Sequence, residues 1–359
     1  MQTSLGVIEG YYGKIFEETK RLNFFDFLAK NHYSYYIYAP KNDAFLRRQW
    51  KDVFSKEELE LLKAQSNKCK SLGLNFGIGI SPLAITEDVD TNLSILLDKV
   101  KVAVEEIHCN IIAILFDDIK LYTQDEGEKQ KTIVNKVRLY LDKLIPQGKK
   151  IRLIFCPTYY SFDAILDKVF GPRPENYFKQ ITHKLLDNIE IFWTGNKVLS
   201  KEITREDLGY INQLLGRKVT LWDNYPVNDG KFICKHVYTR EFVNRINLDG
   251  AALSHAVNPM LECKLNEVSL ATLPLLYRRQ SQTEVKLMRL SKLKELFGNT
   301  VDKIIPILDK LSDFGIEKLS DSEIKALTDF VNCIDTEASF ELRQFLSGYY
   351  QFDPACLTS

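Results

Sequence analysis

Short apolar runs recur along the first three-quarters of the chain and limit its fold more than any other feature. They are rich in β-branched and aromatic residues, and each begins about 35 residues after the one before. The runs are residues 5–8, 35–38, 75–80, 111–116, 151–155, 189–192, 219–221 and 251–253. Continuous apolar runs of this length are typical of strands that are buried on both faces of a parallel sheet.

The stretches between these runs have helical periodicity. Residues 55–71 open with a Ser-x-x-Glu capping box, and residues 92–107, 128–144 and 204–215 show similar amphipathic spacing. Eight strand–helix units in about 277 residues match the size of a closed (β/α)8 unit. We therefore predict an α/β fold, a (β/α)8 TIM barrel, over residues 1–279.

The composition changes after the predicted barrel. Aromatic residues, glycine and proline become rare, and Lys, Glu and Leu dominate. We expect short helices at residues 285–297, 301–314, 322–332 and 336–346, forming a helical C-terminal module over residues 280–359. Such a module serves packing or dimerisation, so a homodimer through these helices is the expected assembly.

Charge and hydropathy restrict the partners of the chain. It carries 48 basic and 48 acidic residues, which argues against a dedicated nucleic-acid binder. No apolar run reaches the ~18 residues of a membrane span, and no signal peptide is visible at the N-terminus. The seven cysteines form no C-x-x-C pair, which favours a reducing compartment. We expect a cytoplasmic protein without a membrane partner, although export by a non-classical route stays open.

Polar or conformationally special residues follow every predicted strand. They are residues 9–13, 39–43, 81–82, 117–118, 156–160, 193–195, 222–226 and 254–259. The active sites of (β/α)8 barrels lie at the carboxyl ends of the strands. We therefore expect function at this end of the barrel.

Asp117 and Asp118 are the most specific signal among these residues, because two carboxylates directly follow a very apolar run. Adjacent carboxylates repel, so their pKa values move apart, and this suits one neutral acid beside one ionised partner. A solvated strand end or a helix N-cap is the plain alternative. A divalent metal site is another, but the fifth and sixth strands end without carboxylates, so we expect no metal.

Aromatic and amide side chains at other strand ends suggest a carbohydrate pocket. Trp193 and Trp222 are two of three tryptophans, and indole rings pack against the apolar faces of sugars. Core or rim packing is the alternative for each. Asn224, Asp229 and Asn258 are suited to binding hydroxyls, although each also fits a turn.

Two further positions have a functional and a plain interpretation. Gly10 and Gly13 flank two tyrosines and permit a tight turn or a close backbone approach. Lys41 follows Ala-Pro and is either a ligand group or a solvated loop residue. No dinucleotide or phosphate-binding loop motif is present, so no cofactor is expected.

Taken together, the strand-end strings resemble glycoside hydrolase family 84, which contains protein O-GlcNAcases and bacterial β-N-acetylglucosaminidases. The strings are residues 6–13, 38–41, 115–119, 155–158, 192–195 and 221–229, within a match over most of residues 5–277. The resemblance implies retaining hydrolysis of terminal β-linked GlcNAc from a glycoprotein or glycan, without metal or cofactor. The substrate's own acetamido group acts as the nucleophile and forms an oxazoline, an exception to the two-carboxylate scheme.

The resemblance also implies a role for each site residue. Asp117 would hold the acetamido N–H, and Asp118 would protonate the leaving oxygen and then activate water. The implied substrate-binding residues are Tyr160 at the acetamido oxygen, Trp222 and Asn224 around the acetamido group, Asp229 at O4 and O6, Gly10, Lys41 and Asn258 at hydroxyls, and Thr194 in the pocket wall.

The chain departs from the family pattern at a few rim positions. Tyr159 stands where the pattern has glutamate, and Asn42 stands where it has aspartate. These departures concern the aglycone more than the chemistry. Two alternatives stay open, a catalytically silent GlcNAc-binding barrel and a metal-dependent barrel hydrolase that uses Asp117 and Asp118.

Overall fold

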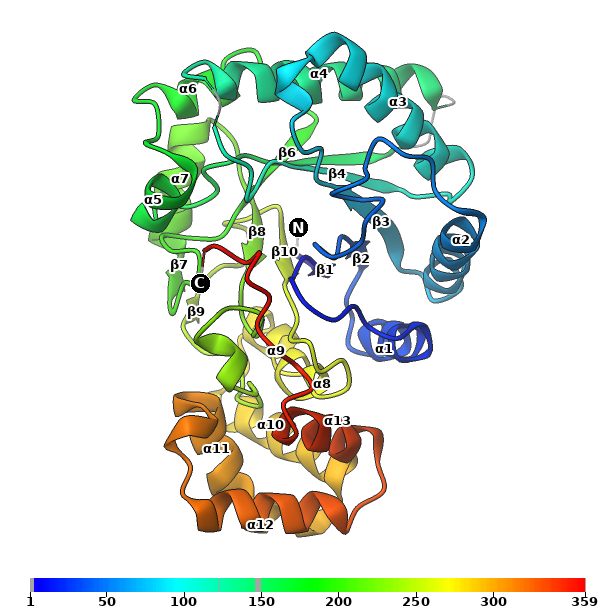
Figure 1. The fold of residues 1–359 in the computed structure, drawn as a ribbon. Coiled ribbons are helices and arrows are strands. Elements are labelled where there is room, and N and C mark those ends of the chain that lie inside the picture. Colours follow the sequence, from blue (N-terminus) through cyan, green and yellow to red (C-terminus); the bar gives the residue numbers. More distant parts are fainter. Residues whose placement is uncertain (1–2, 122, 146–149, 359) are drawn as a thin grey trace.

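A closed barrel of eight parallel strands forms the larger part of the molecule (Figure 1). The structure is a computed structural model that describes residues 3–121, 123–145 and 150–358. Around the barrel the strand order is β1-β10-β8-β6-β5-β4-β3-β2. The strands are β1 (Ser4–Glu9), β2 (Tyr35–Tyr38), β3 (Asn75–Ile80), β4 (Ile111–Leu115), β5 (Arg152–Cys156), β6 (Ile189–Trp193), β8 (Thr220–Asp223) and β10 (Ser254–Val257). The predicted (β/α)8 barrel is confirmed.

The position predicted for the eighth barrel strand was wrong. The sequence pointed to residues 251–253, but these form a turn, and the strand β10 follows them. Its first two residues are polar and fully buried, because their side chains find partners inside the barrel. Tyr35 donates to Ser254 Oγ at 3.2 Å, and the His255 ring lies 2.9 Å from the Tyr277 hydroxyl. A search for apolar runs therefore passed over this strand.

Helices cover the outside of the barrel (Figure 1). They are α1 (Glu18–Lys30), α2 (Lys56–Ser71), α3 (Val89–Glu105), α4 (Glu126–Leu144), α5 (Ala164–Phe170), α6 (Tyr177–Thr182), α7 (Arg205–Leu215), α8 (Asn266–Leu270) and α9 (Leu273–Tyr277). Half of the predicted capping box is present: Ser55 Oγ accepts from the Glu58 amide at 3.1 Å, but the return bond from the Glu58 side chain to the Ser55 amide is not formed between these two described residues. The residue pattern did not predict the small side sheet of β7 (Ile203–Thr204) and β9 (Arg245–Ile246), nor the 3-10 turns η1 (Ile85–Glu87) and η2 (Ile233–Lys235).

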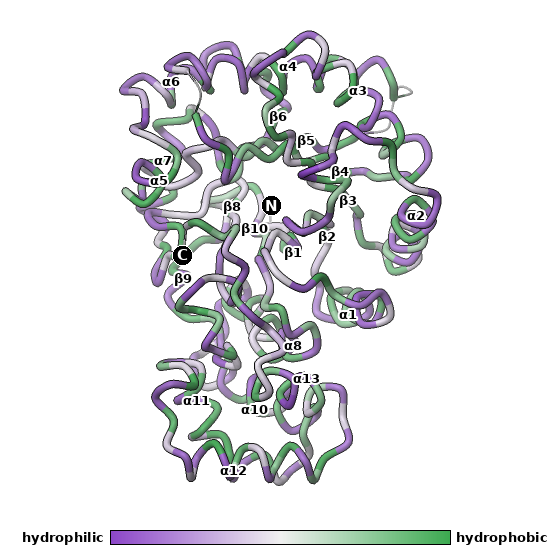
Figure 2. Tube along the Cα trace, in the orientation of Figure 1, coloured by the Kyte–Doolittle hydropathy of each residue, from purple (hydrophilic) through white to green (hydrophobic). Residues whose placement is uncertain are grey.

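The C-terminal helices lie together below the barrel in Figure 1. They are α10 (Gln282–Phe297), η3 (Asn299–Lys303), α11 (Ile305–Phe314), η4 (Ile316–Lys318), α12 (Asp321–Asn332) and α13 (Glu337–Leu346). Hydrophobic residues gather along the barrel strands and on parts of each helix, as the hydropathy colours of Figure 2 show. The C-terminal helices have a hydrophobic cluster of their own, which also includes Val237, Met260 and Leu265 from barrel loops and Val268 from α8.

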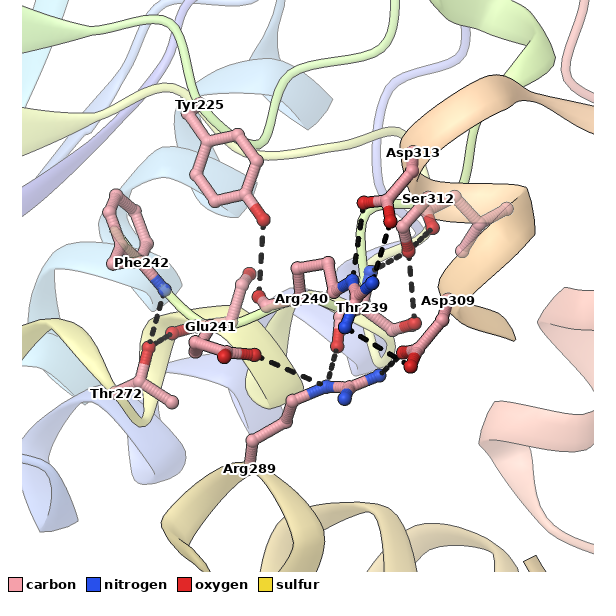
Figure 3. Close-up of polar contacts among 12 residues, drawn as sticks. Tyr225, Thr239, Arg240, Glu241, Phe242, Thr272, Arg289, Asp309, Ser312 and Asp313 are labelled. Carbon is pink, nitrogen blue, oxygen red and sulfur yellow. Dashed lines mark hydrogen bonds and ion pairs between the residues drawn. The ribbon is translucent and has the colours of Figure 1, made fainter. Parts of the chain in front are cut away.

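A polar cluster joins these helices to the loop that follows β8 (Figure 3). Arg289 on α10 is nearly buried, and its Nε donates to the Thr239 carbonyl at 2.6 Å. Its guanidinium also pairs with Asp309 on α11. Arg240 binds Asp313 at 2.6 Å on the same helix. Because buried charges are tolerated only when they are paired, this cluster fixes α10 and α11 to one barrel loop.

The helices of the described residues are all too short or too polar to cross a membrane.

Candidate active site

The ten site residues that the family resemblance implied all line one cavity at the carboxyl ends of the barrel strands. They are Gly10, Lys41, Asp117, Asp118, Tyr160, Thr194, Trp222, Asn224, Asp229 and Asn258. They follow seven different strands or, like Trp222 in β8, lie near the end of one, so the closure of the barrel is what brings them together. Trp193 lies elsewhere, because its ring packs against Phe162 at 4.7 Å, and for this tryptophan core packing is the correct interpretation.

Asp117 follows β4 and is 5% exposed. One of its oxygens, Oδ2, pairs with the Lys41 ammonium, which is itself buried at the end of β2. The other oxygen, Oδ1, is buried and has no hydrogen-bond partner among the residues that the structure describes. Buried acceptors are nearly always satisfied in proteins, so this oxygen is suited to accept a hydrogen bond from a ligand.

Asp118 is half-buried and is held from three sides. Tyr12 donates to Oδ2 at 2.9 Å, and Tyr160 donates to Oδ1 at 3.2 Å. Arg47 donates to the Asp118 backbone carbonyl at 3.2 Å. The residue adopts φ 57°, a left-handed conformation that costs energy outside glycine and often marks functional sites.

The surroundings of Asp118 favour its neutral form. Burial raises the pKa of this carboxyl, and the negative charge of Asp117 raises it further. Lys41, Arg47 and the Tyr12 hydroxyl act in the opposite direction without cancelling the effect. A carboxyl that keeps its proton nearer to neutral pH can act as a general acid.

Asp229 is a third carboxyl in the cavity wall. Its Oδ2 accepts a hydrogen bond from the Tyr12 backbone amide at 2.8 Å. Burial raises the pKa of Asp229 to about 6. A fraction of this carboxyl is therefore protonated near neutral pH, and its oxygens are then able to both donate to and accept from a hydroxyl group.

A connected set of amides and an indole forms another wall. The Gly10 amide donates to Asn258 Oδ1 at 3.2 Å, and Asn258 Nδ2 donates to Asn224 Oδ1 at 3.0 Å. Trp222 Nε1 donates to the same Asn224 oxygen at 2.9 Å. A Cβ at position 10 would lie 2.4 Å from the Trp222 ring, so this backbone approach requires glycine. The Thr194 hydroxyl donates to the Lys197 carbonyl at 3.1 Å.

Two further carboxylates at strand ends are used elsewhere. Glu9 accepts from Arg21 Nε at 2.8 Å, and Asp223 accepts from Arg245 Nε at 2.6 Å and lies 3.0 Å from His255. Burial opposes ionisation of Asp223, but the Arg245 guanidinium lowers its pKa to about 2. Neither carboxylate is among the described residues that line the cavity.

Sequence reasoning missed several residues of the site. Tyr12 was named only as a neighbour of two glycines, yet it binds Asp118. Arg47 gave no signal, because its contact depends on the path of the loop after β2. The tail residues Cys356 and Thr358 also line the cavity. Groups of three or more His, Cys, Asp or Glu side chains that could hold a metal are absent from the described residues.

Comparison with known proteins identifies the family of this chain. A family model described as beta-N-acetylglucosaminidase matches residues 5–309. The chain belongs to this family, glycoside hydrolase family 84. This family 84 member is 31% identical over 283 residues to the protein O-GlcNAcases of Rattus norvegicus and Mus musculus. The alignments cover 76% of this chain and 30% of each relative, so the chain spans less than a third of their length.

Solved structures of family 84 have the same fold. A mutant of the Thermobaculum terrenum O-GlcNAc hydrolase superposes with a TM-score of 0.81 at 25% identity, over 96% of this chain and 80% of that one. CpGH84B superposes with a TM-score of 0.74 at 24% identity, over 94% of this chain and 60% of that one. The second likeness concerns the fold alone.

Proposed function

We propose that this family 84 member is a retaining β-N-acetylglucosaminidase that removes terminal β-linked GlcNAc from a glycoprotein or glycan. One observation carries the proposal: Asp117, whose Oδ1 is unpartnered among the described residues, lines the same cavity as Asp118, a carboxyl whose pKa is raised by its surroundings. An N–H acceptor beside a proton donor suits a sugar that brings its own acetamido nucleophile. The names of the relatives, protein O-GlcNAcase and O-GlcNAc hydrolase, agree with this substrate.

In the first proposed step, Asp117 Oδ1 accepts a hydrogen bond from the acetamido N–H. This polarises the amide, and its carbonyl oxygen attacks C1 of the same sugar. The bond between C1 and the leaving oxygen breaks, and that oxygen takes the proton of Asp118. The acetamido nitrogen keeps its proton in the hydrogen bond to Asp117, so the products are the protonated oxazoline, an oxazolinium ion, and the released aglycone. The Lys41 ammonium balances the charge of Asp117 throughout.

In the second proposed step, water adds to C1 from the side that the aglycone left. Asp118, now a carboxylate, takes a proton from this water. The bond between C1 and the acetamido oxygen breaks, which restores the acetamido group. Two inversions at C1 give net retention, and Asp118 regains its proton for the next cycle.

The other cavity residues are proposed to bind the sugar. Tyr160 contacts the acetamido oxygen, while Trp222 and Asn224 form the acetamido pocket. Asp229 binds the O4 and O6 hydroxyls, a role that suits a carboxyl that can both donate and accept. The remaining hydroxyl contacts come from Gly10, Lys41 and Asn258, and Thr194 lines the wall.

An enzyme nucleophile is hard to find among the other carboxylates. Glu9 and Asp223 are held in buried ion pairs outside the cavity. Asp229 lines the cavity, but its Oδ2 accepts from the Tyr12 backbone amide, and the family resemblance gives this residue a hydroxyl-binding role. The substrate's own acetamido group is therefore the nucleophile that the site favours.

Turnover of matched aryl glycosides tests the proposal. The aryl β-GlcNAc glycoside should be cleaved with retention, and the β-glucoside with the same aryl group should be nearly inert, because it lacks the acetamido group. Progressive fluorination of the N-acetyl group should slow turnover stepwise, and a thiazoline analogue of the oxazoline should bind far tighter than substrate.

Two results would contradict the proposal in different ways. A covalent sugar trapped on Glu9, Asp223 or Asp229 would restore the two-carboxylate scheme. Tight thiazoline binding without any turnover would indicate a silent GlcNAc-binding barrel.

The wider expectations are also proposals. We propose a barrel over residues 1–279 and a helical module over residues 280–359, a homodimer formed through α10–α13, and a cytoplasmic location without nucleic-acid or membrane partners. The shared polar cluster at Arg289 and the barrel residues in the second hydrophobic cluster support close packing of barrel and module.

A further inference from the structure

The C-terminal tail, residues 349–358, leaves α13 and runs to the mouth of the barrel (Figure 1, red). At its start, Lys14 Nζ lies 3.3 Å from the centroid of the Tyr349 ring. Tyr350 packs against both hydrophobic clusters. These contacts attach the tail to the barrel rim before it reaches the catalytic cavity.

A directional polar contact holds the middle of the tail. Asn42 Nδ2, beside the catalytic-cavity residue Lys41, donates to Asp353 Oδ2 at 2.9 Å. The other oxygen of Asp353 accepts from the Ala355 amide at 2.9 Å, which turns the chain toward the cavity. The Asp353 carboxylate thus has two roles: it stabilises a bend within the tail, and it attaches the tail to Asn42.

The end of the tail lies inside the catalytic cavity. Cys356 is 7% exposed, and both Cys356 and Thr358 line the cavity together with the two aspartates. The Thr358 side chain lies close enough to the Tyr160 hydroxyl to lower the pKa of that group, and Tyr160 is the residue that also donates to Asp118. The tail therefore touches the group that is proposed to contact the acetamido oxygen.

With the tail in place, the free volume of the cavity is about 50 Å³. This is room for a few water molecules, whereas small-molecule sites usually hold roughly 300 Å³ or more. A hexose ring with its acetamido group does not fit beside Thr358 and Cys356. Tail and sugar therefore exclude each other.

We propose that residues 349–358 bind in the catalytic cavity as an intramolecular competitor of the substrate, so that turnover requires their release. The inference rests on the proposed function of the cavity. A tethered segment competes at a high effective concentration, on the order of mM, so even weak contacts keep it bound. Substrate binds only the molecules whose tail is released, which we call the open fraction. The apparent Kd for substrate equals the intrinsic Kd divided by this fraction.

Release of the tail therefore has a specific kinetic signature. The KM for substrate falls by the factor by which the open fraction rises, while kcat at saturation is unchanged. A merely structural role of the tail would predict loss of kcat or of thermal stability when its contacts are weakened.

A pair of substitutions in the chain of residues 1–359 tests this directly. Asn42→Asp places a second carboxylate against Asp353, so the docking bond is replaced by repulsion. The KM for an aryl β-GlcNAc glycoside should fall roughly threefold to tenfold, because a hydrogen bond is lost and like charges meet. Adding Asp353→Asn to this variant restores the hydrogen bond with its direction reversed, because the amide NH₂ at position 353 can donate to the carboxylate at position 42. The amide oxygen at position 353 still accepts from the Ala355 amide. The double variant should return KM to the wild-type value.

Asp329→Asn is the matched control, because Asp329 lies exposed on α12, far along the chain from the tail, and pairs with its helix neighbour Lys325. It should leave KM and kcat unchanged. Thr358→Ala provides a second release variant at the far end of the tail, in case position 42 affects folding. The Kd of a thiazoline inhibitor should fall in the same ratio as KM.

The possible outcomes separate the two proposals. The tail proposal is overturned if the wild-type protein is active and both release variants have the same KM as wild type. A lower kcat in these variants at unchanged KM would overturn it as well. If Asn42→Asp lowers KM but the double variant does not restore it, docking through this pair is wrong. If neither wild type nor variants bind thiazoline or turn over, the proposed function itself fails.

Discussion

The hydrogen bond between Tyr12 and Asp118 lowers the pKa of Asp118, the proposed general acid. The phenol donates to Asp118 Oδ2 at 2.9 Å and so favours the ionised carboxylate. Tyr12→Phe removes this donor and leaves the ring. A hydrogen bond to a charged group contributes about 1.5–3 kcal/mol, and one pKa unit corresponds to about 1.36 kcal/mol. The pKa of Asp118 should therefore rise by about one to two units.

The sign of the effect on activity follows from the role of Asp118. The first step needs the protonated carboxyl, so kcat/KM falls as pH rises through the pKa of Asp118. A higher pKa moves this basic limb to higher pH. The assay is kcat/KM against pH for a β-GlcNAc glycoside with a poor leaving group, since protonation matters most there and kcat/KM reports the free enzyme.

Tyr11→Phe is the matched control, because this neighbouring tyrosine donates to Glu9 at 2.9 Å and is not among the described residues of the cavity wall. Its basic limb should coincide with that of wild type. If the limb of Tyr12→Phe stays in place or moves to lower pH, Asp118 is not the acid whose ionisation controls the first step. An equal shift in both variants would point to a general effect on the fold.

Three further predictions concern the paired carboxylates. Asp118→Asn should cost on the order of 10²–10⁴ in turnover of poor leaving groups and much less for activated aryl groups, which need little protonation; equal losses would count against the acid role. Asp117→Asn should impair activated aryl substrates as well, because attack by the acetamido oxygen is itself weakened, so identical leaving-group profiles would refute two separate roles. A chelator should leave turnover unchanged, because the Lys41 ammonium already pairs with Asp117, a carboxylate that a metal cation would need. If a chelator abolished activity and a divalent metal restored it, the metal-dependent alternative would be favoured.

The barrel was predictable because most of its strands carry an unmistakable composition. The run of β4 is apolar at every position, since both of its faces are buried. Strand β10 escaped the same reasoning, because Ser254 and His255 are satisfied by partners that only the closed barrel supplies. The C-terminal helices were visible as well, and their predicted ranges overlap α10 to α13.

The site was predictable wherever a residue directly follows a strand. Barrel geometry alone brings such residues to one end, whatever the loops do, and this holds for Asp117 after β4 and Lys41 after β2. Arg47 and the tail residue Thr358 are different, because they reach the cavity through the course of irregular segments. No local pattern of residue types records that course, so sequence reasoning had no basis for including them.

The roles of the two adjacent aspartates cannot be told apart from the local sequence. Their adjacency predicts that two carboxylates with unlike environments lie together, but it does not tell which of them is the acid. In the folded chain Asp117 meets the ammonium from the end of β2, while Asp118 takes a left-handed backbone conformation and meets tyrosines that follow β1 and β5. In the proposed mechanism, this division of labour depends on three strand ends that are distant in sequence. Lys41 acts on both carboxylates, because it pairs with Asp117 and its charge also lowers the pKa of Asp118. Tyr12 donates directly to Asp118, so Tyr12→Phe is expected to change mainly that carboxylate.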